Sequence, residues 1–247
     1  MIKSIKSLHV TLILILFILA LVIQLPATIS QQWLENNHIK VNGINGTIWN
    51  GRASEADING WYLRDIKWEF IPKKLLSGEI SYKLSMYPFN GLIHTILTLK
   101  SDKTINFNKL EGNLSHGTLE AIFPYFGIDS AIKLNIKEII IDSGVPTLIN
   151  GKITLNNLVI KGLSNQPVGS YEIELITQSN QIIGSFDDID ALLDVAGTIT
   201  VSRKGKYTLT GIVSSNAFTP DNIKTMLTFL GTANEKNQRN FRFEGEL

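Results

Sequence analysis

The feature that most constrains this chain is an apolar run near its N-terminus. No charged side chain occurs from Ser7 to Leu34, and the segment from Leu8 to Leu25 is almost wholly apolar. About 18 residues of α-helix rise roughly 27 Å, which is close to the hydrocarbon thickness of a bilayer. Lipid permits a helix because all backbone polar groups then find partners within the segment. The run therefore predicts a transmembrane anchor.

The charges beside this run predict its orientation. Lys3 and Lys6 precede it, and no acidic residue occurs before position 30. Positive charge of this kind holds a helix end on the cytoplasmic side. The alternative is a cleaved signal peptide, whose apolar core spans about 7–15 residues before a small-residue cleavage site. The run here is longer, and in either case the rest of the chain leaves the cytoplasm.

Beyond the anchor, apolar and polar residues alternate with a period of two. The pattern is clear over 132–137, 171–175, 199–201, 207–211 and 241–244. It is typical of antiparallel strands with one dry and one wet face. We therefore expect a mainly β fold. In it, an N-terminal transmembrane helix precedes a curved antiparallel sheet, a meander that forms a partly open barrel or groove, with a few short helices.

Local signals predict where helices and turns fall. Thr219 is a candidate cap for a helix that Gly231 ends, and shorter helical turns are expected at Pro72–Ser77 and Thr118–Phe126. Residues 232–240 are expected to form an exposed loop. Several glycines are expected to begin strands and to permit a turn or bulge there: Gly46, Gly112, Gly117, Gly151, Gly197 and Gly245. A further bulge is expected near Asn156-Asn157, where the apolar parity slips.

Charge and cysteine content exclude several classes of function. The chain has 23 basic and 22 acidic residues, and a nucleic-acid-binding protein needs a basic face. There is no cysteine, which excludes disulfides, thiolate metal sites and a cysteine nucleophile. No nucleic-acid partner is expected.

The residues most often used in catalysis and metal binding do not form a recognisable pattern. The histidines are His9, His38, His94 and His116, and none has a second histidine at i+2 or i+4. The acidic cluster is Asp187, Asp188, Asp190 and Asp194, which lacks the spacing of a calcium loop. Asp187 and Asp188 are better explained as the start of a short helix. We therefore expect that the protein is not an enzyme and has no catalytic, cofactor-binding or metal-binding residues. We also expect that it uses no cofactor and no small-molecule substrate.

Aromatic residues crowd one short stretch: Trp49, Trp61, Trp68 and Phe70. Trp68 shares one side of a period-two run with Ile66 and Phe70, so we expect it on the dry face. We expect Trp49 and Trp68 to pack in the core of the first part of the sheet. The alternative is that the aromatic cluster is an interaction surface.

The first third of the chain carries a recognisable combination of motifs. Leu25-Pro26-Ala27 follows the anchor, Gly43–Ala53 reads GINGTIWNGRA, and Ile66–Gly78 reads IKWEFIPKKLLSG. In these features the chain resembles protein N of the bacterial type II secretion system. The resemblance extends more weakly over residues 196–247, and residues 85–150 match mainly in strand character.

The resemblance implies a location and a role. It implies a single-pass protein of the cell inner membrane, with residues 1–30 as cytoplasmic tip and transmembrane anchor and residues 31–247 as a periplasmic β-rich domain. Such a protein would be an accessory part of the machine that exports folded proteins from the periplasm across the outer membrane. Its partners would be other secretion components and, through its helix, the lipid bilayer. The alternative from the strand pattern is a periplasmic lipid-handling or chaperone-like protein with an apolar β-groove.

Overall fold

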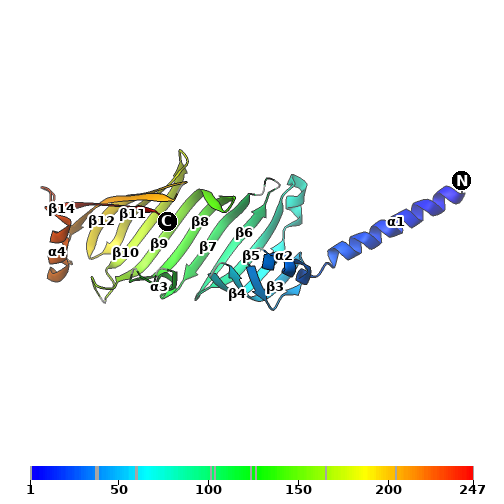
Figure 1. The fold of residues 1–247 in the computed structure, drawn as a ribbon, viewed down its shortest axis with the longest axis horizontal. Coiled ribbons are helices and arrows are strands. Elements are labelled where there is room, and N and C mark those ends of the chain that lie inside the picture. Colours follow the sequence, from blue (N-terminus) through cyan, green and yellow to red (C-terminus); the bar gives the residue numbers. More distant parts are fainter. Residues whose placement is uncertain are drawn as a thin grey trace.

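The chain folds into one long antiparallel sheet from which an N-terminal helix projects (Figure 1). The computed structural model describes residues 2–36, 39–58, 61–100, 102, 104–122, 124–125, 127–164, 166–203 and 205–246, with side chains from residue 11 onward. The mainly β fold with few short helices is therefore confirmed for the described residues.

Fourteen strands make up the described sheet. They are β1 (Ile39–Asn42), β2 (Asn45–Gly46), β3 (Asn50–Ile58), β4 (Trp61–Phe70), β5 (Ile80–Pro88), β6 (Gly91–Leu99), β7 (Ile105–Leu114), β8 (Ile128–Asp142), β9 (Val145–Ile160), β10 (Gly169–Gln178), β11 (Gln181–Ala191), β12 (Leu193–Ser202), β13 (Lys206–Ser215) and β14 (Gln238–Glu246). From β3 to β14 each strand pairs with its neighbours in sequence, so the sheet is an open meander.

The described helices are short except for the first. They are α1 (Ile2–Ile23), η1 (Ala27–Ser30), α2 (Gln31–Asn36), η2 (Pro72–Ser77), α3 (Thr118–Ile122), α4 (Asp221–Leu227) and η3 (Thr228–Leu230), where η marks a 3-10 helix. The predicted turn at Pro72–Ser77 and the late helix are confirmed, and the turn from Thr118 ends at Ile122.

Two details of the late helix differ from the prediction. Pro220, not Thr219, occupies the N-cap position of α4. Thr219 is buried, and its Oγ1 accepts a hydrogen bond from Asn216 N at 2.8 Å, so its hydroxyl serves the preceding turn. The loop predicted over 232–240 is also too long, because β14 begins at Gln238.

The first helix exposes apolar side chains. Its large apolar residues from Leu12 to Ile23 are all exposed. Among the residues that the structure describes, no helix combines the length and apolarity that crossing a membrane requires. The anchor expected over residues 8–25, and the domain boundary at residue 30, stay predictions.

Turn chemistry explains how the long strands reverse. Ser143 and Gly144 join β8 to β9, and Ser179 and Asn180 join β10 to β11, all four with positive φ. Two-residue turns of this handedness match the twist of antiparallel strands. In a meander, every second turn lies at the same ends of the strands, which we call one margin of the sheet. The segment between β7 and β8 contains α3, and the segment between β13 and β14 contains α4. These two helices therefore lie on the same margin (Figure 1).

The strand registers place one continuous set of apolar side chains on the same side of the sheet. Representative cross-strand partners are Trp68 and Leu84, Leu134 and Ile153, and Ile199 and Leu209. We call this side the apolar face. It comprises Trp68, Phe70, Tyr82, Leu84, Met86, Ile93, Leu97, Phe107, Leu110, Ile132, Leu134, Ile136, Ile153, Leu155, Tyr171, Ile173, Leu175, Phe186, Val195, Ile199, Val201, Tyr207, Leu209, Val213, Phe241 and Phe243.

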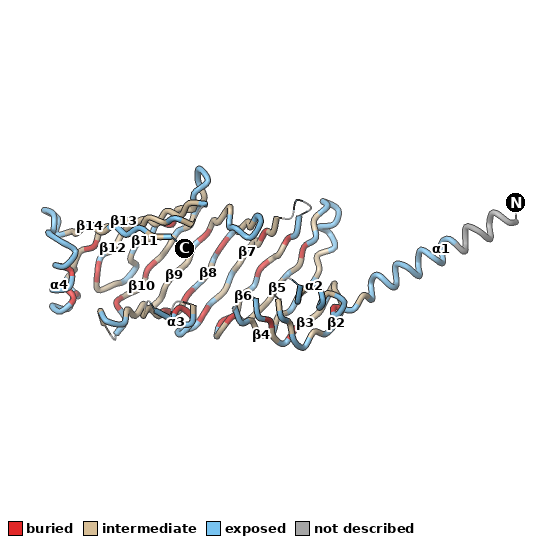
Figure 2. Tube along the Cα trace, viewed as in Figure 1, coloured by how far each residue is buried: buried red, intermediate tan, exposed pale blue. Residues whose placement is uncertain are grey.

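Buried residues are dispersed along the strands and do not gather at one centre (Figure 2). One buried cluster forms where Leu119 of α3 packs on Leu114 and Ile132. Another forms where Ile223 and Leu227 of α4 pack on β12 and β13. Most of the apolar face between these clusters is only half-buried. The two short helices therefore cover parts of one margin, and the rest of the face lacks a second layer among the described residues.

The bulge expected near Asn156-Asn157 is confirmed. Asn157 has φ 53°, and the register of β9 shifts by one residue there against both neighbours, β8 and β10. An extra residue in one strand of a pair produces this shift and bends the strand. Lys109 in β7 has a similar positive φ, beside a second register shift.

The prediction that glycines begin strands was wrong for most of them. Gly112, Gly151 and Gly197 lie inside strands, Gly245 is near the end of β14, and Gly117 precedes α3. Two of these glycines, Gly197 and Gly245, instead lie beneath aromatic rings of the neighbouring strand, as do Gly51 and Gly211. The register pairs are Gly51 with Trp68, Gly197 with Phe186, Gly211 with Phe241, and Gly245 with Tyr207. The absence of a Cβ at these positions leaves room for the rings.

Candidate functional site

The end of α1 is fastened to the start of the sheet. Trp49 Nε1 donates a hydrogen bond to Val22 O at 2.7 Å, and Ile48 N donates to Leu25 O at 3.0 Å. Pro26 and Thr47 form an antiparallel bridge beside them. The last carbonyls of a helix lack partners within the helix. Trp49 is therefore a second donor to Val22 O, which also accepts from Leu25 N at 3.3 Å, and it ties α1 to the sheet.

Aromatic rings extend this junction along the first strands. Trp68 Nε1 donates to Thr47 O at 3.0 Å, and the ring centroids of Trp49 and Phe70 are 4.8 Å apart in an edge-to-face arrangement. The ring of Phe70 lies 5.5 Å from that of Tyr82. A row of rings thus leads from the end of α1 onto the apolar face.

The prediction that the tryptophans lie in a core was wrong. Trp49 and Trp68 are half-buried, and Trp61 is 48% exposed. Trp68 does lie on the apolar side as expected, opposite Leu84. Each of these two rings is therefore covered only in part, by neighbours such as Phe70 for Trp49 and Leu84 for Trp68.

The apolar face is the largest candidate surface. It runs from Trp68 in β4 to Phe243 in β14 through successive register pairs, and charged residues such as Lys133, Lys152 and Glu172 lie on the other side. Soluble monomers rarely expose contiguous apolar patches of more than a few hundred Å². Such a face is suited to contact with apolar ligand or partner surfaces.

The polar side carries a shallow depression near the same end. Its lining includes polar side chains and some apolar ones: Lys67, Glu69, Lys83, Ser85, His94, Thr95, Lys109, Trp68, Leu84 and Ile96. Lys83 Nζ lies 3.1 Å from Glu69 Oε1, and both side chains are well exposed. Exposed pairs of this kind contribute little to stability. This grouping could not be predicted from the sequence, because it depends on the register of β4, β5, β6 and β7.

The acidic cluster does not form the helix start that was predicted. Asp187, Asp188 and Asp190 lie in β11, and Asp194 lies in β12. Asp188 Oδ1 accepts a hydrogen bond from Val195 N at 2.7 Å, and Asp194 Oδ1 accepts one from Asn216 Nδ2 at 2.9 Å. Within the described part of the chain, no three His, Asp or Glu side chains are grouped to hold a metal ion.

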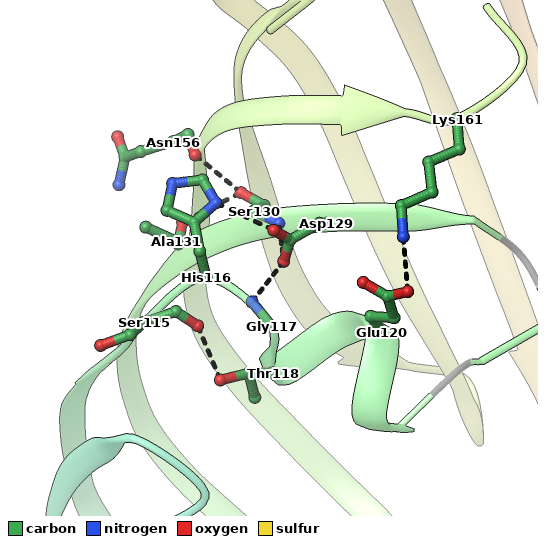
Figure 3. Close-up of polar contacts among 10 residues, drawn as sticks. All are labelled: Ser115, His116, Gly117, Thr118, Glu120, Asp129, Ser130, Ala131, Asn156 and Lys161. Carbon is green, nitrogen blue, oxygen red and sulfur yellow. Dashed lines mark hydrogen bonds and ion pairs between the residues drawn. The ribbon is translucent and has the colours of Figure 1, made fainter. Parts of the chain in front are cut away.

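The histidines are scattered. His94 is exposed on β6, the side chain of His9 and all of His38 lie outside the described residues, and His116 is exposed beside Asp129. Figure 3 shows this last contact, in which His116 Nδ1 lies 3.1 Å from Asp129 Oδ2. Ser130 is nearby, but its Oγ donates to Asn156 O at 2.9 Å and to Ala131 O at 3.0 Å. This group is therefore not arranged as a nucleophile with its base.

Asp129 instead holds the loop before α3. Its Oδ1 accepts hydrogen bonds from Gly117 N at 2.6 Å and Ser130 N at 2.8 Å. Burial raises the pKa of this carboxyl, but the hydrogen bonds from Gly117, His116 and Ser130 outweigh burial and leave the pKa below its ordinary value. Lys161, which directly follows β9, forms an ion pair with Glu120 of α3 (Figure 3).

The chain is similar in sequence to proteins of one family. Residues 37–242 match the family described as type II secretion system protein N. The chain is 25% identical over 207 residues to the type II secretion system protein N of Pectobacterium carotovorum subsp. carotovorum, with 82% of each chain covered. It is 22% identical over 261 residues to the protein of the same name from Aeromonas hydrophila, covering 98% of this chain and 99% of that protein. No solved structure matches it. Because the family match takes in more than half of the chain, this protein belongs to the protein N family of the type II secretion system.

Proposed function

We propose that the protein is an accessory inner-membrane component of the type II secretion system that acts by protein–protein contact. The observation that carries the proposal is the family match, which begins before β1 and ends within β14 and so takes in almost the whole sheet. In this role the protein supports export of folded proteins from the periplasm across the outer membrane, and its partners are other components of that machine.

Removing the protein from its host tests this role. Secreted proteins should then accumulate folded in the periplasm and fall in the culture medium, and supplying the full chain should restore the medium fraction. An unchanged medium fraction in the strain without the protein would contradict the proposal.

The proposed location is the inner membrane, with the sheet in the periplasm. Support comes from Lys3 and Lys6 ahead of the uncharged run and from the exposed apolar side chains between Leu12 and Ile23. A reporter fused after residue 247 should be active only outside the cytoplasm.

The double substitution Leu14→Arg and Phe17→Arg should release the protein from membranes, since each central Arg costs roughly 2.5–3.5 kcal/mol of insertion energy. Leu14→Ile is the matched control and should stay bound.

We also propose that the protein is not an enzyme. The scattered histidines and the hydrogen bonds that occupy Ser130 support this. Replacing His38, His94 and His116 together by Gln should leave secretion intact. Loss of secretion by this variant, at normal abundance and with normal melting, would contradict a non-enzymatic role.

A second candidate function is lipid handling, which the apolar face favours. An extended peptide on this face would leave its backbone N–H and C=O groups without partners, whereas an acyl chain has no such groups. A photo-crosslinking residue at Leu134, on the apolar face, should then capture phospholipid, while the same residue at Asn135, on the other side, should not. Protein adducts at position 134 without lipid would favour the partner-binding role alone.

A further inference from the structure

The two ends of the sheet are not equally protected. At one end, β1 has only four residues and is packed against α2. At the other end, β14 has nine residues, paired with β13 over the whole of its length in unbroken register. Within the described residues no strand pairs with the outer side of β14. An edge strand of this length presents a row of unpaired N–H and C=O groups to any strand that can match it.

The helical segment after β13 shields only the beginning of β14. Arg239 Nε donates to Gly231 O at 3.1 Å, which places the end of η3 beside the first residues of the strand. From Asn240 to Glu246 the outer edge has no such cover among the described residues. β14 contains neither a proline nor a register shift, which are common devices for protecting an edge.

The side chains of this open segment alternate in a self-complementary order. Phe241, Phe243 and Gly245 lie on the apolar side, and Phe243 is 54% exposed although it belongs to the apolar face. Arg242 and Glu244 lie on the polar side, opposite Thr210 and Thr208 of β13. Within β14, Arg242 Nε donates to Glu244 Oε1 at 2.9 Å. The two charged side chains therefore pair with each other, and their neighbours on β13 are threonines.

We propose that the outer edge of β14 pairs with the same edge of a second copy of this chain. The two strands run antiparallel about a two-fold axis at Phe243, which lies opposite the partner's Phe243. In this register Arg242 lies opposite the partner's Glu244, and Glu244 lies opposite the partner's Arg242. Phe241 meets the partner's Gly245, where no Cβ opposes the ring. Closed two-fold interfaces of this kind use one surface patch twice.

The charges select this register over its neighbours. A shift by two residues in one direction places Arg242 opposite its own copy, and a shift in the other direction places Glu244 opposite its own copy. Like charges directly opposite one another destabilise a strand pair, and opposite charges stabilise it. A shift by one residue would set apolar side chains against polar ones. The pairing extends the apolar face across both copies, and it does not depend on the role in secretion.

Cysteine crosslinking tests the register, because the natural chain has no cysteine. Opposed residues of antiparallel strands have Cα atoms about 4.5–5.5 Å apart, within the range that a disulfide accepts. The full-length Phe243→Cys variant in detergent micelles should therefore form a disulfide dimer on mild oxidation. Asn240→Cys is the matched control and should not, because it is opposed by position 246. Mixing Asn240→Cys with Glu246→Cys should produce a mixed dimer. Equal crosslinking at 240 and 243, or none at 243, overturns the proposal.

Charge reversal tests whether the partner is a second copy. Arg242→Glu alone, or Glu244→Arg alone, should weaken self-association about tenfold or more, because two cross-strand rows change from attraction to repulsion. The double variant Arg242→Glu with Glu244→Arg restores both rows and should recover the dimer, measured as mass by light scattering at matched concentration. Both side chains are more than half exposed, so the variants should melt like the parent. If the double variant stays as monomeric as the single ones, or if the parent is monomeric, pairing between copies is wrong.

Discussion

Substituting Gly197, in the middle of β12, by alanine would test how closely its neighbours on the adjacent strands approach it. A Cβ at Gly197 would lie 2.4 Å from Phe186 Cζ and 2.4 Å from Thr210 O, about 1 Å inside ordinary van der Waals contact. The carbonyl belongs to the backbone of β13, so it cannot rotate away. Overpacking of this kind costs about 1–3 kcal/mol. Gly197→Ala should therefore destabilise the protein, although alanine is ordinarily the better strand residue.

Gly184 provides the matched control, because it also lies inside a strand on the apolar side. A Cβ there would meet Ile199 Cγ2 at 2.8 Å and Leu175 Cδ2 at 3.1 Å, and both are side-chain atoms, whereas Gly197 also faces a backbone carbonyl. Replacing a strand glycine by alanine gains roughly 0.5–1 kcal/mol, which offsets this crowding. Gly184→Ala should melt close to the parent.

Thermal melting of the full chain separates the two variants. A chain of this size loses about 2–4 °C in melting temperature for each kcal/mol, so Gly197→Ala should melt about 2–12 °C lower. Equal melting temperatures for the parent, Gly197→Ala and Gly184→Ala would refute the close-approach reasoning.

Three further substitutions test other contacts. Trp49→Phe keeps a ring beside Phe70 but removes the donor to Val22 O, so it should loosen the α1 junction by about 0.5–1.5 kcal/mol and speed proteolysis between residues 24 and 36; unchanged cleavage would contradict this. Asp129→Asn should flatten the loss of stability in acid, because a carboxyl with a lowered folded-state pKa stabilises fully above its unfolded pKa of about 3.9 and less as pH falls through the folded value. Urea midpoints from pH 6 to pH 3 that fall in parallel for parent and variant would argue against it. Ile223→Ala, at a side chain 1% exposed under α4, should cost about 2–5 kcal/mol and raise hydrogen exchange across α4, and a variant with native exchange would exclude the packing role.

The alternation of side chains was enough to predict the strands and the two-faced sheet. Ile132, Leu134 and Ile136 lie on the apolar face as their spacing required, and the slip at Asn157 is a bulge. These features depend on residues near one another in sequence. The open meander keeps most contacts between neighbouring strands, so local pattern carries much of the fold.

What the sequence did not predict depends on the register between strands and on the missing second layer. Gly197 resembles a strand start in sequence, yet it is an interior position whose purpose is set by Phe186 on the next strand. Trp68 has the pattern of a core residue, but it is only half-buried. Asp187 and Asp188 resemble a helix start, and the pairing of β11 with β10 overrides that local preference. The free edge of β14 is likewise visible only once the sheet order is known.

The order of strands in space repeats the order in which the ribosome makes them. From β3 onward, each strand finds its partner in the strand synthesised just before it. Contacts between near neighbours close short loops, and such loops form quickly. The sheet can therefore grow one hairpin at a time, much as a repeat protein propagates from unit to unit. Among the described strands β14 is the last to join, so its open edge forms only after the others have found their partners.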